Sequence, residues 1–143
     1  MKVMASILFS YFATVGFGIT LNIPRRALNA CGLVGMFGWA AYLLVKEISL
    51  GSMLANLLSA FVIGLGSMYL ARKKFVPTIL LNTPSLVPLV PGGQAYQAVK
   101  NFAMHNNMLA INYLVQVALV AGAIAMGLFL AELVGQTVIK LKN

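Results

Sequence analysis

Long apolar runs, separated by short clusters of polar or charged residues, make up most of this chain. Five such runs cover residues 3–23, 27–45, 50–71, 75–91 and 109–139. At about 1.5 Å of rise per residue, four of them are long enough to cross the roughly 30 Å hydrocarbon core of a membrane as single helices. The pattern predicts an all-α integral membrane protein, with a bundle of about five transmembrane helices forming one domain over residues 1–143.

The fourth run differs from the others because prolines interrupt it. Pro84, Pro88 and Pro91 lie in otherwise apolar sequence between residues 75 and 91. Each proline lacks a backbone donor and crowds the carbonyl four residues earlier, so a regular helix cannot continue through all of them. We therefore expect a short, broken fourth helix. The alternation of polar and apolar residues that follows predicts an amphipathic helix over about 93–105.

Small side chains recur at helical spacing in two of the runs. They are Gly32, Gly35 and Gly38 in the second run, and Ala123, Gly127, Ala131 and Gly135 in the last. A helical face without bulky side chains lets a second backbone approach closely. Both runs are expected to pack tightly against neighbouring helices, and the last run is long enough to tilt or protrude from the membrane.

Composition places the chain among membrane proteins. Of 143 residues, 61% are hydrophobic and 8% are charged, with a mean hydropathy of +0.93. The net charge of +8 comes from ten Lys and Arg residues that fall between apolar runs. They are not interleaved with aromatic residues on a polar face, so membrane orientation explains them better than a nucleic-acid partner does.

The basic residues also predict the orientation. If all five runs cross, one side carries Arg25, Arg26, Arg72, Lys73, Lys74, Lys140 and Lys142. The other side carries Lys2, Lys46 and Lys100. Positive residues favour the cytoplasmic side, so we expect the N-terminus outside and the C-terminus inside the cell. A re-entrant fourth run would give a weaker split, with Lys100 joining the first group and the C-terminal lysines leaving it.

Two further features mark expected membrane boundaries. The turn formed by Pro24, Arg25 and Arg26 is predicted to be cytoplasmic and to contact anionic lipid headgroups. Trp39 and Tyr42 lie near the far end of the second run, where amphipathic rings are typical of a membrane interface. A packing role for these two rings is equally consistent with their positions.

No soluble-enzyme motif occurs in the sequence. Cys31 is the only cysteine, His105 the only histidine, and Glu47 and Glu132 the only acids. These residues form no carboxylate pair at useful spacing, no metal-binding motif and no phosphate loop. We therefore expect no catalytic residues, no metal and no cofactor, and we expect Cys31 to be a small packing residue.

Polar residues beside the broken segment are the main functional candidates. Asn82 and Thr83 precede the first of its prolines, where unwound backbone in transporters often meets substrate. They could instead bond to neighbouring helices. A polar group inside a membrane is costly unless it has a partner. We therefore expect each of these side chains to contact either substrate or a neighbouring helix.

A second group of candidates follows the break. Gly92, Gly93, Gln94 and Tyr96 lie where a new helix is expected to begin. The positive N-terminal end of a helix favours an anionic group, and a carboxylate fits that position. The alternative is a simple helix start at the membrane surface.

Two ionisable residues are candidates for proton coupling. Glu132 lies about 12 Å along the helix before Lys140 and is expected to be partly within the membrane. It could carry a proton, although such residues more often extend toward the interface or pair with a lysine. His105 lies beside two asparagines, and a solvated loop is the simpler expectation for it.

Three stretches of the chain resemble the bacterial threonine/serine exporter (ThrE) family. They are VGFGITLNIPRRA at 15–27, CGLVGMFG at 31–38 and PLVPGGQAY at 88–96. Their order and spacing match the family over nearly the whole chain, and within it the chain is similar to the short, separately encoded YjjB-like membrane subunits. The family motif carries Pro88, Pro91, Gly92 and Tyr96, together with Pro24 and Arg26 of the first turn.

The resemblance implies a subunit of a bacterial inner-membrane secondary exporter. Its substrate would be a small carboxylate, either threonine and serine or a dicarboxylate such as succinate. Full-length exporters of this type fuse a larger half to a half like this one, so a larger partner subunit of the same family is implied, with a homo-oligomer as a further possibility. The alternative is a membrane scaffold subunit that contacts no substrate. A proline-broken segment at membrane depth favours the exporter.

Overall fold

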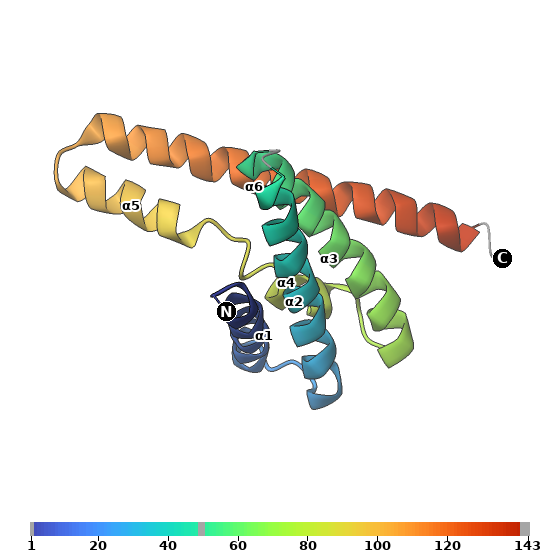
Figure 1. Ribbon diagram of the computed structural model, residues 1–143. Helices are drawn as coiled ribbons and strands as arrows, with labels where there is room; N and C mark the ends of the chain where they lie inside the picture. The colour runs from blue at the N-terminus through green and yellow to red at the C-terminus, as the bar shows by residue number, and fades with distance from the viewer. Residues whose placement is uncertain (1, 49–50, 141–143) are drawn as a thin grey trace.

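The computed structural model describes residues 2–48 and 51–140, and all regular secondary structure in these residues is helical (Figure 1). The six helices are α1 (Lys2–Thr20), α2 (Arg25–Glu47), α3 (Ser52–Lys74), α4 (Ile79–Ser85), α5 (Gly92–Ala103) and α6 (Asn107–Lys140). The predicted all-α architecture is confirmed. Leu50, where the third run was expected to start, and Lys142, counted with the basic side, lie outside the described residues.

The first helix is shorter than predicted because of the residues at its end. It stops at Thr20, not at residue 23, and Asn22 adopts a left-handed backbone conformation with φ of 59°. Pro24 then precedes α2, and the residue before a proline is disfavoured in a helix. The turn 21–24 therefore separates two helices whose apolar runs are nearly continuous in sequence.

Helices α1 and α3 both pack on α2 through close glycine contacts. A Cβ added at Gly32 would meet Tyr11 of α1, and one added at Gly35 would meet Thr14. On the same helix, a Cβ at Gly38 would meet Ile63 of α3. The predicted glycine face of the second run is thus confirmed, and it packs against two helices.

Helix α6 runs in the same direction as α3. Gly127 faces Leu57 and Ala60 near the start of α3, and Gly135 faces Met68 near its end. This confirms that the ladder of small residues on α6 packs against a neighbouring helix. As a consequence, the C-terminal end of α6 lies toward the end of the bundle where Lys74 closes α3.

Helix α5 and the first half of α6 form a hairpin that extends away from the other helices (Figure 1). Ala98 of α5 and Ala110 of α6 are fully buried, whereas many larger apolar side chains of this hairpin are exposed. The predicted amphipathic helix over 93–105 corresponds to α5, which ends two residues earlier because His105 takes a positive φ of 59°.

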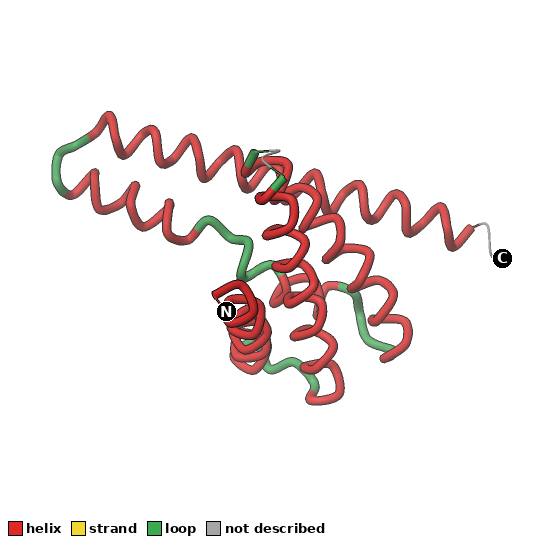
Figure 2. The backbone as a smooth tube through the Cα atoms, viewed as in Figure 1, coloured by secondary structure: helices red, strands yellow, loops and turns green. Residues whose placement is uncertain are grey.

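Four of the helices, α1, α2, α3 and α6, are long and apolar enough to cross a membrane. The fourth predicted span, 75–91, is not a fifth helix of this kind: it contains only the seven residues of α4 and turns on either side (Figure 2). The prediction of a short, broken segment is therefore confirmed. The buried core beside it comprises Ile23, Ala27, Ala30, Cys31, Ala71 and Leu81.

Candidate functional site

The broken segment is held against α2 by two contacts to Cys31. The Cys31 thiol donates to the carbonyl oxygen of Leu80 across 3.4 Å, and the Ser85 hydroxyl donates to the carbonyl oxygen of Cys31 across 3.1 Å. Cys31, Leu81 and Ser85 have no exposed surface. Cys31 is thus a packing residue, as expected, and it anchors α4 beside the second turn of α2.

From this anchor the chain advances along α2. Leu80 lies beside Cys31, and Pro88 and Leu89 share a cavity with Trp39, eight residues further along α2, a rise of about 12 Å. Turn hydrogen bonds satisfy much of the intervening backbone, including Leu86 N–H to the Asn82 carbonyl and Val90 N–H to the Leu86 carbonyl. The segment after Pro84 is therefore a series of turns that runs along α2 from the level of Cys31 to the level of Trp39.

Two cavities lie beside the broken segment, one at the turns after α4 and the other at α4 itself. The first, which we call the Trp39 cavity, has a volume of about 170 Å³. Its walls include Trp39 of α2, Ser52 and Asn56 of α3, Pro88 and Pro91 of the turn, and Gln94 of α5. Three of the predicted site residues, Pro88, Pro91 and Gln94, therefore lie together, between helices that are distant in sequence.

The polar groups of the Trp39 cavity include a hydrogen-bond donor without a partner. The Trp39 indole Nε1 is buried and has no hydrogen-bond partner among the described residues. The Asn56 amide donates to the Ser52 carbonyl across 2.7 Å, and the Gln94 amide also lines the space. Buried donors without partners are uncommon in folded proteins, so the free indole N–H marks a place where an acceptor would be stabilised.

Trp39 is partly buried, as is the neighbouring ring of Tyr42. Its ring stacks on Tyr42 with centroids 5.0 Å apart and an interplanar angle of 19°. The Lys46 Nζ lies over the Tyr42 ring, 5.8 Å from its centroid. The two rings thus pack against each other, as one of the two expectations for this pair has it, while both stay partly exposed. Trp39 and Asn56 were not singled out as site residues, although a polar side chain in an apolar run was the available signal.

The second cavity, which we call the Glu132 cavity, lies between α3, α4 and α6. It has a volume of about 340 Å³, and its walls include Gly64, Met68, Thr78, Asn82, Leu128 and Glu132. The Asn82 side-chain oxygen is buried and has no partner among the described residues. The Glu132 carboxylate accepts a bond from the Gln136 amide across 3.3 Å. Two predicted candidates, 50 residues apart in sequence, thus share one cavity.

Buried polar side chains on α3 extend from the level of one cavity to the level of the other. Asn56, Ser59 and Ser67 are all buried and, at spacings of three and eight residues, share a face of the helix. The hydroxyls of Ser59 and Ser67 have no hydrogen-bond partner among the described residues. Polar groups therefore continue along α3 from the Trp39 cavity to the level of the Glu132 cavity.

The remaining predicted residues lie outside both cavities. Thr83 is exposed, and its hydroxyl donates to the Ile79 carbonyl of its own helix across 3.0 Å. Gly92 and Gly93 are exposed on the first turn of α5, next to the cavity residue Pro91, and Tyr96 is 67% exposed. Pro24, Arg25 and Arg26 are exposed at the start of α2, and His105 lies in the exposed turn before α6.

The fold and these cavities define a multi-pass membrane protein with polar space inside an apolar bundle. Residues 6–134 match the family model described as "Threonine/Serine exporter, ThrE". Because the match covers most of the chain, the protein belongs to this bacterial family of membrane transporters, which is not an enzyme family. The resemblance noted in the sequence is thus confirmed.

A relative and the solved structures add further comparisons. An "Uncharacterized protein" of Haemophilus influenzae is 24% identical over 141 residues, which is 93% of this chain and 48% of that protein. The chain therefore spans about half the length of this curated relative. No solved structure matches the chain.

Proposed function

We propose that this chain is the membrane subunit of a secondary exporter for small carboxylate metabolites, such as threonine and serine or a dicarboxylate such as succinate. Membership of the exporter family supports the class of activity. The observation that carries the substrate class is the buried, unpartnered N–H of Trp39, a residue that lines a cavity together with amide side chains and the broken segment. A carboxylate would accept from these donors.

The size of the Trp39 cavity agrees with a small substrate. Its 170 Å³ is well below the roughly 300–1,000 Å³ of pockets that hold drug-sized ligands. Pro88 and Pro91 shape its wall, and Gln94 contributes an amide. Gly92, Gly93 and Tyr96 lie on the exposed side of the same turn of α5. We propose that they contact substrate only once a second subunit covers them.

The Glu132 cavity is proposed to supply the coupling proton. Glu132 is exposed, and its carboxylate accepts a bond from Gln136. We propose that its protonated form turns toward Asn82, which lines the same cavity and has a buried side-chain oxygen without a partner among the described residues. A hydrogen bond between the two would link α6 to α4, and α4 leads directly to the Trp39 cavity. His105 is a weaker candidate because it lies in an exposed turn, apart from both cavities.

The proposed topology follows from the direction of the helices. The start of α2 with Arg25 and Arg26, the end of α3 with Arg72, and the C-terminal end of α6 lie toward one end of the bundle. We propose that this end is cytoplasmic and that the N-terminus is outside. We also propose a larger partner subunit, because the curated relative is about twice as long as the region it shares with this chain.

Reconstituted transport tests this function. Efflux of labelled threonine, serine and succinate is measured from proteoliposomes that contain the chain with and without its larger partner, and with and without a pH gradient. We expect efflux that needs both chains and responds to the gradient. Full-rate transport by the partner alone would show that this chain is a scaffold.

A pair of asparagine variants locates the pathway. Asn82→Ala removes the amide in the Glu132 cavity, whereas Asn101→Ala removes an amide that bonds to Gln97 of its own helix. At equal membrane abundance, efflux should fall in the first variant and persist in the second. Equal efflux from both would remove Asn82 from the pathway.

A further inference from the structure

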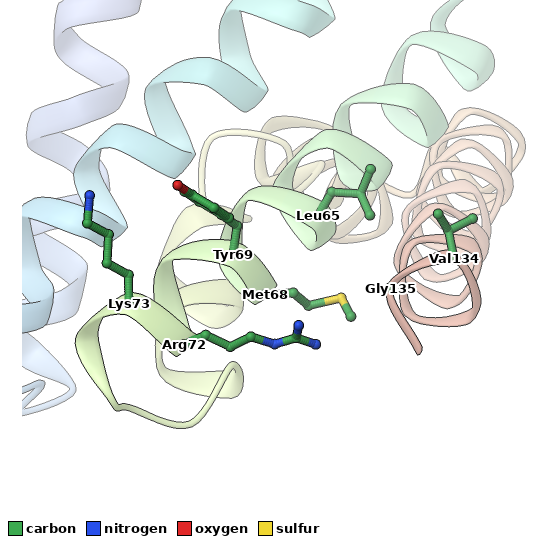
Figure 3. Close-up of a pocket in the computed structure, with 7 residues that line it drawn as sticks. All are labelled: Leu65, Met68, Tyr69, Arg72, Lys73, Val134 and Gly135. Carbon is green, nitrogen blue, oxygen red and sulfur yellow. The ribbon is translucent and has the colours of Figure 1, made fainter. Parts of the chain in front are cut away.

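A basic, partly apolar cavity lies on the outer surface of α3 near its C-terminal end. It measures about 520 Å³, and its walls include Leu65, Tyr69, Arg72 and Lys73 of α3 and Val134 and Gly135 of α6. Figure 3 shows Arg72 extending on the side of α3 where α6 lies, and Lys73 and Tyr69 extending on the opposite side. The two cations therefore flank the outer face of the helix.

An apolar groove adjoins this cavity. It lies between α2 and α3, measures about 630 Å³ and shares Leu65 and Tyr69 with the basic cavity. Its other walls include Leu33, Phe37 and Ala41 of α2 and Val62 and Gly66 of α3. Among the described residues, no charged side chain lines it. The basic cavity and the apolar groove thus lie on the two sides of α3 and meet at Leu65 and Tyr69.

The dimensions of this surface match one leaflet of a bilayer. Ten residues of α3 separate Arg72 at the basic end from Val62 in the groove, a rise of about 15 Å. The hydrocarbon core of a bilayer is roughly 30 Å thick, so one leaflet occupies half of it. An acyl chain that begins at the level of Arg72 would therefore end near Val62.

Charge selects the kind of lipid. Arg72 and Lys73 are the charged residues that line the basic cavity, and no acidic side chain lines either hollow. Basic pockets between transmembrane helices on the cytoplasmic side are suited to anionic headgroups. A phosphate over the outer face of α3 would have one cation on each side, and it would accept charge-assisted bonds, which are the strong ones, once Arg72 and Lys73 turn toward it.

We propose that this surface binds one anionic phospholipid. Its phosphate lies between Arg72 and Lys73, and one acyl chain follows the groove between α2 and α3. The inference does not depend on the substrate or on the export activity. The bound lipid would fill the crevices on both sides of α3 and hold α2, α3 and α6 together at this end.

Lipid retention by the purified full chain tests the proposal. The chain is reconstituted in nanodiscs of phosphatidylcholine and phosphatidylglycerol with identical acyl chains, extracted in mild detergent, and analysed by native mass spectrometry. We expect preferential retention of phosphatidylglycerol at a stoichiometry of one, and no displacement by inorganic phosphate. Equal retention of the two lipids, or displacement by free phosphate, would overturn the lipid site.

Matched charge variants separate this site from general attraction to the membrane. Arg72→Gln with Lys73→Gln should weaken phosphatidylglycerol retention about 30-fold, which corresponds to about 1 kcal/mol for each basic side chain. Lys46→Gln with Lys100→Gln removes the same charge from exposed positions on α2 and α5, outside both hollows, and should change retention little. The same loss in both double variants would show that no specific site exists.

A groove variant tests the acyl chain without changing the charge. A Cβ at Gly66 would meet only Val34, at 3.7 Å, so Gly66→Leu can fill the groove from a tolerated position. Gly16→Leu is the control because a Cβ at Gly16 meets nothing within 4 Å. We expect lower lipid retention only in Gly66→Leu. Unchanged retention in Gly66→Leu, or cross-linking of a protein helix in the groove in native membranes, would contradict the proposed occupant.

Discussion

Gly127 of α6 lies directly against the main-chain carbonyl oxygen of Leu57 in α3. A Cβ added to Gly127 would collide with that oxygen and would also lie 2.9 Å from the Ala60 Cβ. Backbone atoms cannot rotate away as a flexible side chain can. The close contact of α3 and α6 therefore requires glycine at this position, and it sets how closely the two helices approach where they cross.

Gly127→Ala is therefore expected to destabilise the bundle by about 1–3 kcal/mol, the usual cost of overpacking a tight interface. Gly122→Ala is the matched control on the same helix, since a Cβ there meets nothing within 4 Å. The control should be neutral or more stable by up to about 1 kcal/mol, because alanine favours the helix. Thermal unfolding in detergent measures both. Equal stabilities would contradict the close contact of α3 with α6.

Ser85→Ala tests the anchor of the broken segment. The substitution removes the bond from the Ser85 hydroxyl to the Cys31 carbonyl, and we expect a loss of about 0.5–1.5 kcal/mol in the free energy of unfolding. Ser6→Ala is the control, since the Ser6 hydroxyl bonds only to the Val3 carbonyl one turn earlier in α1. If the two variants unfold at the same temperature, the tie between α4 and α2 contributes nothing.

The sequence predicted the helices better than it predicted their contacts. Apolar runs longer than a bilayer crossing indicate α1, α2, α3 and α6 directly, and the prolines indicate where regular helix must stop. Those signals are local. The direction of α6 relative to α3 depends on matching shapes such as Gly127 against Leu57, which involve residues far apart in the chain.

The candidate site was predicted in part for the same reason. Pro88, Pro91 and Gln94 are close in sequence and share a cavity. By contrast, Asn82 and Glu132 line one cavity because α4 and α6 both pack against α3, and no pattern within either segment indicates it. Trp39 fits a membrane interface by sequence, and only the packing of the turn after α4 places it in a cavity.

Trp39→Phe separates binding from stability. The indole N–H has no partner in the structure, so its removal should leave the unfolding temperature nearly unchanged. If the N–H donates to a substrate carboxylate, KM for efflux should rise about 10- to 100-fold, since such bonds contribute about 1.5–3 kcal/mol.

Tyr11→Phe provides the opposite pattern for comparison. The Tyr11 hydroxyl donates to the Asn29 side-chain oxygen across 2.7 Å, away from both cavities. Its removal should lower stability by up to about 1 kcal/mol and leave KM unchanged. Efflux kinetics and thermal unfolding, measured on both variants, check the two patterns together. A Trp39→Phe variant with normal KM would show that the indole N–H does not contact substrate.

Glu132→Gln tests proton coupling, and the sequence offers a clean control because Glu47 is the only other acid. Glutamine resembles the neutral form of glutamate and can still donate to the Asn82 oxygen, so the link between α6 and α4 would no longer depend on pH. We therefore expect efflux by Glu132→Gln to lose its response to a pH gradient while its unfolding temperature changes little. Glu47→Gln, at the exposed end of α2, should keep the full response. Gradient-driven efflux of normal size from Glu132→Gln proteoliposomes would assign the coupling proton to another group.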